Sequence, residues 1–244
     1  MDNKIERNSM SMHQQMRKQL CSQQKGFTLI EIAIVLVIIG LLLGGVLKGQ
    51  ELINSARVRA LNNTADGITA AWFSFQDRYR AFPGDYTLAT TNLPGVTAVV
   101  GNGNGDGQIT TDPERNNVWV HLEAAGYITG GYNNESLSVT ADYACSVAQC
   151  PDNGFGAGMV ISHGALYSGA TNAHELISGR GIPVDVLAEL DRKIDDGIPL
   201  NGSMQLGDEA TGWTGGTIRA DCLNSTNYQL QTPSDNCAAI FRNF

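Results

Sequence analysis

Charged side chains are scarce in this sequence, at 16% of 244 residues, and basic ones are the scarcer kind. The chain has 16 Lys and Arg against 24 Asp and Glu, and after residue 26 the balance is 11 to 22. A surface that acidic repels phosphate backbones, so we expect no nucleic-acid partner. Low charge combined with 28 glycines also argues against a coiled, all-helical protein and favours a loop-rich domain.

The motifs of common catalytic sites are missing as well. Ser162 is not part of a Gly-x-Ser-x-Gly elbow, because Val160 stands where the first glycine is needed. The glycine-rich stretch after residue 100 lacks the Lys-Ser/Thr pair that binds phosphate. Three histidines lack metal-ligand spacing: His121, His163 and His174. We therefore predict that the protein is not an enzyme.

A long apolar run lies close to the N-terminus. From Phe27 to Leu47 the sequence has 21 residues with one charge, Glu31, which is enough to cross the roughly 30 Å hydrocarbon core as a helix. Three basic residues come shortly before the run and one, Lys48, directly after it. The positive-inside rule then predicts a single-pass membrane protein with a cytoplasmic N-terminus and the remainder of the chain on the outer side.

The small residue that could serve as a cleavage site precedes this run. A secretory signal is cut after its apolar stretch, at a site of the Ala-x-Ala kind, and no such site follows Leu47. Instead Gly26 stands on the cytoplasmic side, in the string Lys25-Gly26-Phe27-Thr28-Leu29-Ile30-Glu31. The order predicts a leader that is removed before the membrane segment.

This string and the apolar run after it resemble the prepilin signature of the type IV pilin and type II secretion pseudopilin superfamily. The resemblance implies an inner-membrane protein with a periplasmic domain, cleaved between Gly26 and Phe27 by a prepilin peptidase that is addressed by Lys25, Gly26 and Phe27. It also implies N-methylation of Phe27 and assembly with other pilin or pseudopilin subunits on an inner-membrane assembly platform.

Glu31 has a physical interpretation of its own. A carboxylate inside hydrocarbon is costly, and ionisable groups there are candidates for function. Its cation could be the Phe27 amine of the same chain or that of a neighbouring subunit, which would set the register of a filament. The alternative is a glutamate that only extends to the membrane interface.

The helix is expected to continue beyond the membrane as an amphipathic segment. Pro83 cannot continue a helical hydrogen-bond ladder, so we expect the helix to end at Phe82. The chain is thus divided into a leader (1–26), a membrane helix (27–47), its continuation (48–82) and an outer domain (83–244). One apolar stripe is predicted on the continuation: Leu52, Ala56, Ala60, Ile68, Ala71 and Phe75.

The outer domain alternates short apolar runs with turn-forming residues, which predicts an antiparallel sheet with insertions. Two helices are expected within it, from Asp112 to Gly126 and from Pro183 to Ile194. Strands are expected near 157–162, 203–206, 216–220, 227–231 and 238–242. The predicted class is an α+β, pilin-like fold: a long N-terminal helix packed on an antiparallel sheet.

Four cysteines follow the leader: Cys145, Cys150, Cys222 and Cys237. In a domain outside the cytoplasm an even number predicts two disulfides, with three connectivities to choose from. Pairing of sequence neighbours, 145 with 150 and 222 with 237, closes small loops at low entropic cost and is favoured. The alternative is free buried thiols.

A glycine-rich loop has the pattern of half a calcium site. Oxygen side chains stand at relative positions 1, 3 and 5, with glycine at 6 and an apolar residue at 8. Position 12 is Pro113, so acids on either side of it would have to complete the shell. The alternative is a hairpin loop whose Asn-Gly and Asp-Gly pairs supply positive φ. The candidate calcium ligands are Asn102, Asn104, Asp106, Gln108, Asp112 and Glu114.

The sequence thus predicts a structural subunit of a type IV pilus or a type II secretion pseudopilus. Its size after cleavage favours a minor subunit. The alternative is a membrane-tethered domain, calcium-binding or enzymatic, that does not polymerise.

Overall fold

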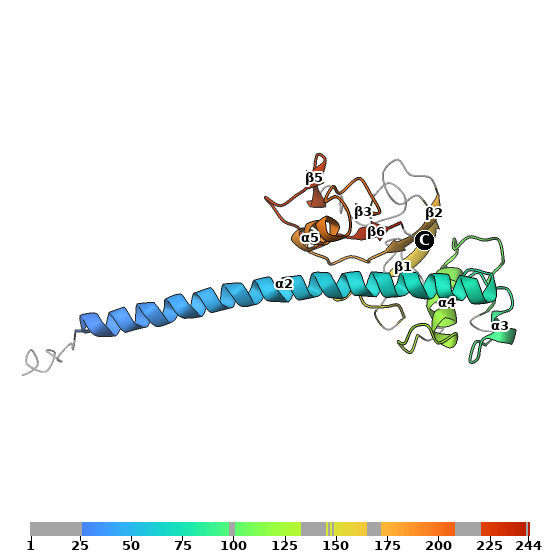
Figure 1. Ribbon diagram of the computed structural model, residues 1–244, viewed down its shortest axis with the longest axis horizontal. Helices are drawn as coiled ribbons and strands as arrows, with labels where there is room; N and C mark the ends of the chain where they lie inside the picture. Colours follow the sequence, from blue (N-terminus) through green and yellow to red (C-terminus); the bar gives the residue numbers. More distant parts are fainter. Residues whose placement is uncertain are drawn as a thin grey trace, which may run out of the picture. The chain divides into compact units, whose positions relative to one another are not determined.

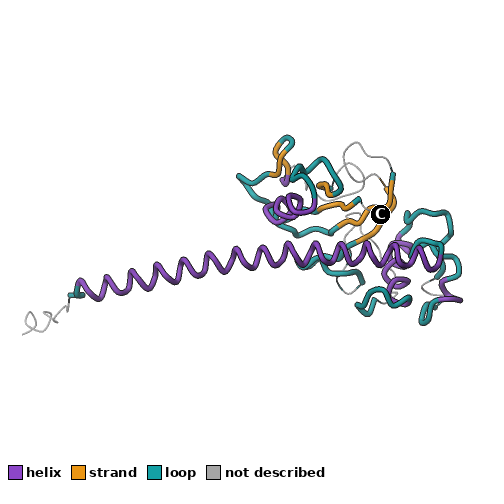
Figure 2. The backbone as a smooth tube through the Cα atoms, viewed as in Figure 1, coloured by secondary structure: helices purple, strands orange, loops and turns teal. Residues whose placement is uncertain are grey.

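The computed structural model describes residues 26–97, 101–132, 145, 147, 149–164, 172–207, 221–242 and 244. The chain forms two compact units, Met1–Glu51 and Leu52–Phe244. The longest element, helix α2 (Leu29–Tyr79), begins in the first and ends in the second. Figure 1 labels the elements, and Figure 2 distinguishes helices, strands and loops.

The described part of the first unit consists of residues 26–28 and the beginning of α2. Its large apolar side chains are all exposed, from Phe27 at 82% to Leu47 at 67%. The most apolar 18-residue window of α2 has a mean hydropathy of 2.8 and is not buried at all. A helix this long and apolar is a candidate membrane span, as the sequence predicts.

In the second unit α2 buries one face, but the predicted stripe is only half correct. Ile68, Ala71 and Phe75 are buried, whereas Leu52, Ala56 and Ala60 are exposed. The buried face consists of Val58, Leu61, Ala65, Ile68, Ala71, Trp72 and Phe75. Steps of three and four along this face follow the 3.6-residue period of the helix. The predicted stripe begins with successive steps of four, which rotate around the helix and so leave the face that packs on the core.

The end of α2 also differs from the prediction. The helix stops at Tyr79 because Arg80 adopts a left-handed conformation, with φ of 53°, and its amide donates to the Gln76 carbonyl at 2.9 Å. This is an αL cap, and it terminates the helix three residues before Phe82. Pro83 therefore lies in the turn beyond the helix and does not end it.

The two shorter helices of the sequence prediction are present. Helix α4 covers Asp112–Ala124 and α5 covers Val184–Ile194, and a third, α3, is a single turn at Ala89–Asn92. The cap of α4 is Thr111, not Asp112: the Thr111 side chain accepts from the Glu114 amide and the Glu114 side chain accepts from the Thr111 amide. This reciprocal capping box fixes the position of Glu114.

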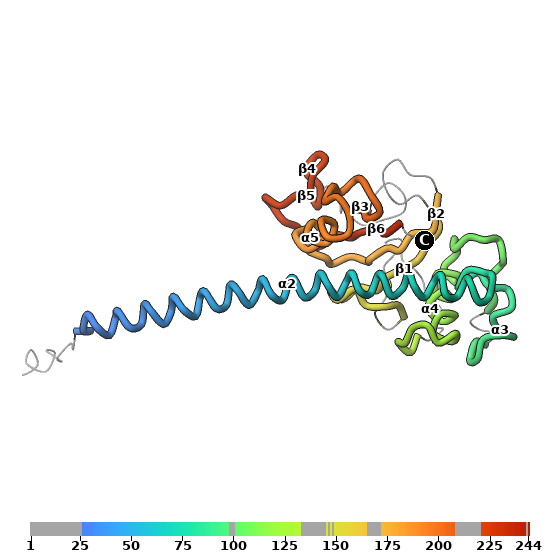
Figure 3. Tube along the Cα trace, in the orientation of Figure 1, coloured from blue at the N-terminus to red at the C-terminus, as the bar shows by residue number. Residues whose placement is uncertain are grey.

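The main sheet is antiparallel with strand order β1-β2-β6-β3. Its strands are β1 (Val160–Gly164), β2 (Ala173–Ile177), β3 (Met204–Leu206) and β6 (Ala239–Phe241), and β4 (Leu223–Asn224) pairs with β5 (Asn227–Tyr228) separately. In Figure 3 the last strand, β6, runs beside β3. This arrangement confirms the α+β, pilin-like class of long N-terminal helix followed by antiparallel sheet.

Individual strands were predicted unevenly. Runs 157–162, 203–206 and 238–242 overlap β1, β3 and β6, while 227–231 contains only the two residues of β5. Strands β2 and β4 were missed. The expected strand at 216–220 lies outside the described residues.

Both disulfides join sequence neighbours. Cys145 is bonded to Cys150 and Cys222 to Cys237, which are the two pairs that loop entropy favours. Cys237 also belongs to a bridge in which its amide and carbonyl pair with Ile182. The second disulfide therefore ties the region before β6 to the residue before β4, and the backbone bridge ties it to the segment that leads into α5.

Candidate functional site

The segment of the predicted cleavage site precedes α2. Gly26 and Phe27 are exposed and have no regular secondary structure, while Lys25 lies outside the described residues. A Cβ added to Gly26 would meet no atom within 4 Å. In the described residues the bond between Gly26 and Phe27 is therefore exposed and lies outside the helix.

Glu31 caps its own helix in the uncleaved chain. Its Oε2 accepts hydrogen bonds from the Thr28 amide and the Thr28 hydroxyl, each at 2.7 Å, and its amide donates to the Thr28 hydroxyl at 3.3 Å. Thr28-x-x-Glu31 is a capping box that sequence reasoning missed, although the pattern signals it. The Glu31 carboxylate is therefore held one turn from the place where cleavage would create an amine.

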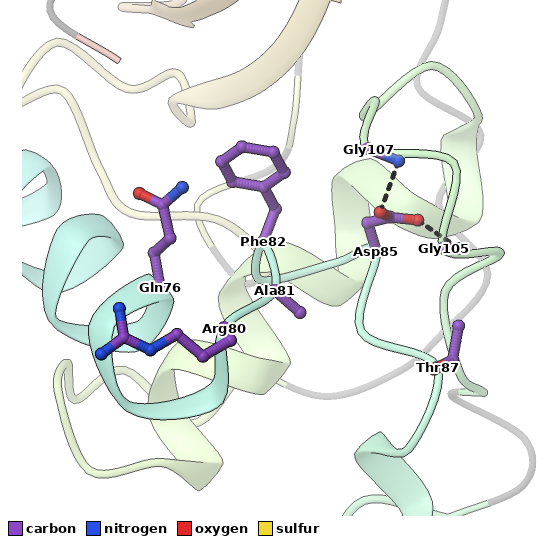
Figure 4. Close-up of a pocket in the computed structure, with 8 residues that line it drawn as sticks. All are labelled: Gln76, Arg80, Ala81, Phe82, Asp85, Thr87, Gly105 and Gly107. Atoms are coloured by element: carbon purple, nitrogen blue, oxygen red, sulfur yellow. Dashed lines mark hydrogen bonds between the residues drawn. The ribbon is translucent and has the colours of Figure 1, made fainter.

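A second candidate site lies in the outer domain, where the turn after α2 meets the glycine-rich loop. A hollow of about 320 Å³ opens there, lined by Gln76, Arg80, Ala81, Phe82, Asp85, Thr87, Gly105 and Gly107. Figure 4 shows Asp85 turned toward the loop, with dashed lines to the two glycines. The Asp85 side-chain oxygens accept from the Gly105 amide at 2.5 Å and from the Gly107 amide at 2.8 Å.

Three carboxylates converge beside this hollow. Ligand oxygens of Asp85, Asp106 and Glu114 lie within 4.8 Å of one another, and the residues Asp85 and Glu114 are each only 4% exposed. Burial raises the pKa of Asp85, and the charges of Asp106 and Glu114 raise it further, against the two glycine hydrogen bonds that lower it. Such a cluster favours a proton or a cation.

The loop is built for close approach to Asp85. A Cβ on Gly103 would lie 2.1 Å from the carbonyl carbon of Asp85, so only glycine fits there. The Gly103 amide in turn donates to the Tyr86 carbonyl at 3.0 Å. These contacts place the loop against the turn that carries Asp85.

Of the six predicted calcium ligands, the structure places only Asp106 and Glu114 in the carboxylate cluster. Asn102 accepts instead from the amide and hydroxyl of Thr90, and Asp112 forms an ion pair with Arg115 at 2.8 Å. Asn104 and Asp106 stabilise the loop itself: the Asn104 side chain accepts from the Asp106 amide, and Asp106 from the Gln108 amide. The predicted ligand set and the carboxylate cluster therefore share only Asp106 and Glu114. The sequence pattern missed Asp85 because it lies about twenty residues before Asp106.

The histidines have structural surroundings. Nδ1 of His121 accepts from the Gly84 amide at 2.9 Å, and burial lowers the pKa of His121 to about 4. His163 and His174 face each other across β1 and β2, with ring centroids 5.0 Å apart. Burial and the neighbouring His163 lower the pKa of His174 to about 4.

The long N-terminal helix and the exposed segment before it fit a precursor of the pilin or pseudopilin type. Residues 21–47 match the family model described as the prokaryotic N-terminal methylation motif, which is the signature of prepilin-type proteins. The resemblance seen in the sequence is thereby confirmed. Searches among curated proteins and solved structures found no match.

The motif bears on the processing and the location of the chain. It implies processing by a prepilin peptidase and assembly with pilin subunits, and together with the apolar helix it fits a membrane-anchored protein. Proteins with this motif are structural rather than catalytic.

Proposed function

We propose that this protein is a minor structural subunit of a type IV pilus or a type II secretion pseudopilus. It is cleaved after Gly26, N-methylated at Phe27 and assembled into a helical filament through an inner-membrane platform. The observation that carries the proposal is the match of residues 21–47 to the methylation motif, within which the residues from Leu29 onward form an exposed apolar helix. Before assembly the domain faces the periplasm.

Glu31 is the residue that we assign to subunit register. Cleavage would leave a charged amine at Phe27, four residues before a carboxylate that now accepts only from Thr28 among the described residues. In hydrocarbon this carboxylate needs a cation. The amine of a neighbouring subunit supplies one when the helices are staggered correctly.

The test separates a filament subunit from a tethered domain. Full-length protein is followed by immunoblot with and without prepilin peptidase, and sheared filaments are probed for the mature chain. We expect a peptidase-dependent shift and recovery in the filament fraction, with Gly26→Val, which replaces the small residue by a bulky one, as the uncleaved control. If the chain keeps its leader, or is absent from the sheared filaments, it is a membrane-tethered domain and not a filament subunit.

We further propose a divalent cation, with calcium as the first candidate, at Asp85, Asp106 and Glu114. Two observations favour it: three carboxylates converge with two of them buried, and the neighbouring loop provides further oxygen side chains. The hollow lined by Asp85 would give the ion a route to the cluster.

A melting experiment on the full chain tests this second proposal. Millimolar calcium should raise the melting temperature and a chelator should lower it, because a ligand of the folded state stabilises that state. Asp85→Asn should abolish the shift. Asp112→Asn, at a position that the loop pattern predicts as a ligand but that pairs with Arg115, should keep it. Equal melting temperatures with calcium and with chelator would exclude the proposed cation site.

A further inference from the structure

Strand pairing brings two histidines together that the sequence keeps apart. His163 on β1 lies directly opposite His174 on β2 in the antiparallel register of the two strands. Their ring centroids are 5.0 Å apart, and the planes of the rings are inclined at 66°. Strand β1 is an outer strand of the sheet, and His163 is only partly buried on it, whereas His174 is 8% exposed. The pair therefore leads from the surface of the sheet into its interior.

The buried member of the pair has a nitrogen without a partner. Nε2 of His174 is inaccessible to solvent and forms no hydrogen bond within the described residues. Buried polar atoms are nearly always hydrogen-bonded, so an exception calls for an explanation. The rings of Trp72 and Phe82 pack on His174, with centroids 5.2 and 4.6 Å away, and neither supplies that partner. A phenylalanine would make the same ring contacts without burying a polar atom.

The spacing of the two rings is that of imidazoles that share a metal ion. With Zn–N bonds of about 2.1 Å and a tetrahedral angle, two imidazoles on one zinc have ring centres about 5.2 Å apart. The observed 5.0 Å is close to this value. Because the rings meet edge to face, one has to turn about its Cβ–Cγ bond to direct a nitrogen at the ion. His163 is the partly exposed ring and turns without a change in the strand pairing.

The surroundings of the pair suit a transition-metal cation. Burial and the neighbouring His163 lower the pKa of His174 to about 4, so this imidazole is in the neutral, metal-binding form at neutral pH. Imidazole nitrogens favour zinc and copper, whereas calcium takes oxygen ligands. Within the described residues, three ligand atoms of His, Cys, Asp or Glu converge only at Asp85, Asp106 and Glu114. Water would therefore complete the coordination of an ion at the histidines.

We propose that His163 and His174 form a zinc site at the edge of the sheet, with both imidazoles as ligands and water in the remaining positions. The ion joins β1 to β2 through side chains and supplies the partner that the buried nitrogen lacks. The site differs from the carboxylate cluster in its ligand chemistry, and it does not depend on the filament function. With two protein ligands it binds more weakly than a closed structural site with four.

Calorimetric titration of the full chain in detergent, purified without an oligohistidine tag, tests the site. Excess calcium is present to compete for the carboxylate cluster, and zinc should bind wild type with a micromolar Kd. His163→Gln and His174→Phe should each weaken zinc binding about tenfold or more. His174→Phe keeps an aromatic ring against Trp72 and Phe82 and should keep the melting temperature. Asp85→Asn, in the carboxylate cluster, should bind zinc like wild type.

Three results would overturn the zinc site. The first is a zinc affinity of wild type no better than millimolar. The second is unchanged binding in either histidine variant, because both imidazoles are assigned as ligands. The third is loss of binding in Asp85→Asn, which would place the zinc at the carboxylate cluster.

A measurement on wild type alone does not depend on how the variants fold. Diethyl pyrocarbonate modifies accessible neutral imidazoles, and mass spectrometry of the digested chain locates the product. Zinc should reduce the modification of His163 several-fold, since a nitrogen bound to the ion is no longer nucleophilic. Equal modification of His163 with and without zinc would show that the ion does not bind there.

Discussion

Lowering the pH from 7 to 5 should destabilise the outer domain through His121. This side chain is fully buried, and at neutral pH its Nδ1 accepts from the Gly84 amide. Protonation would turn that acceptor into a donor and place a charge among apolar neighbours such as Phe75, whose ring stacks on His121 with centroids 6.2 Å apart. Folding therefore disfavours protonation of His121.

The magnitude follows from the shift in pKa. Burial lowers the pKa of His121 from 6.5 to about 4, so between these values the unfolded chain binds more protons than the folded one. The stability that neutral His121 contributes is therefore fully present above pH 6.5 and is lost as the pH falls toward 4. At 1.36 kcal/mol per pKa unit, about 2 kcal/mol is lost at pH 5 and about 3 kcal/mol below pH 4.

Other groups titrate in the same range and have to be separated from His121. His174 acts in the same direction, because burial lowers its pKa too. Burial raises the pKa of Asp85 and of Asp191, so these carboxyls bind protons more readily in the folded state and oppose the loss. Comparison with a variant at position 121 alone cancels these contributions.

The variant is His121→Asn, which keeps an acceptor for Gly84 and does not titrate. Urea unfolding of the full chain in detergent, with chelator present, is followed through the buried Trp72 and Trp119 at pH 7 and 5. Wild type should lose about 2 kcal/mol more than the variant between the two pH values. Equal losses in the two proteins would refute the reasoning.

Three further results are expected. Thr111→Ala should lower the free energy of unfolding by about 1 kcal/mol in urea, because the α4 cap is lost, while Thr110→Ala should change little. Replacing Cys222 and Cys237 by serine should cost about 3 kcal/mol by the same assay, and a loss under 1 kcal/mol would show that this crosslink does not constrain the unfolded chain. Glu31→Ala should leave insertion and cleavage intact but reduce sheared filaments, and normal filaments would exclude the register role.

The predictable parts of the fold depend on signals that are local in sequence. The long N-terminal helix, the helix from Asp112 and the helix that ends at Ile194 each carry their own apolar pattern and end signals, and the bounds of all three were predicted to within a few residues. Strand β2 carries no such signal: His174 and Glu175 are polar, yet the structure buries both. Only pairing with β1 and β6 makes these residues a strand, and a single sequence does not show pairing.

The carboxylate cluster shows the same limit at a functional level. The loop pattern proposes ligands spaced along one stretch of chain, but the oxygen that joins Asp106 and Glu114 comes from Asp85, in a turn that precedes the loop. Two features bring it close: α2 ends at Tyr79, where Arg80 turns the chain, and Gly103 allows the loop to touch the Asp85 backbone. Neither feature can be recognised before the fold is known. Nothing in the sequence marks Arg80 as left-handed, and Gly103 is one of 28 glycines. A search for cation sites in similar chains should therefore look for an acid in the turn after the long helix as well as in the loop.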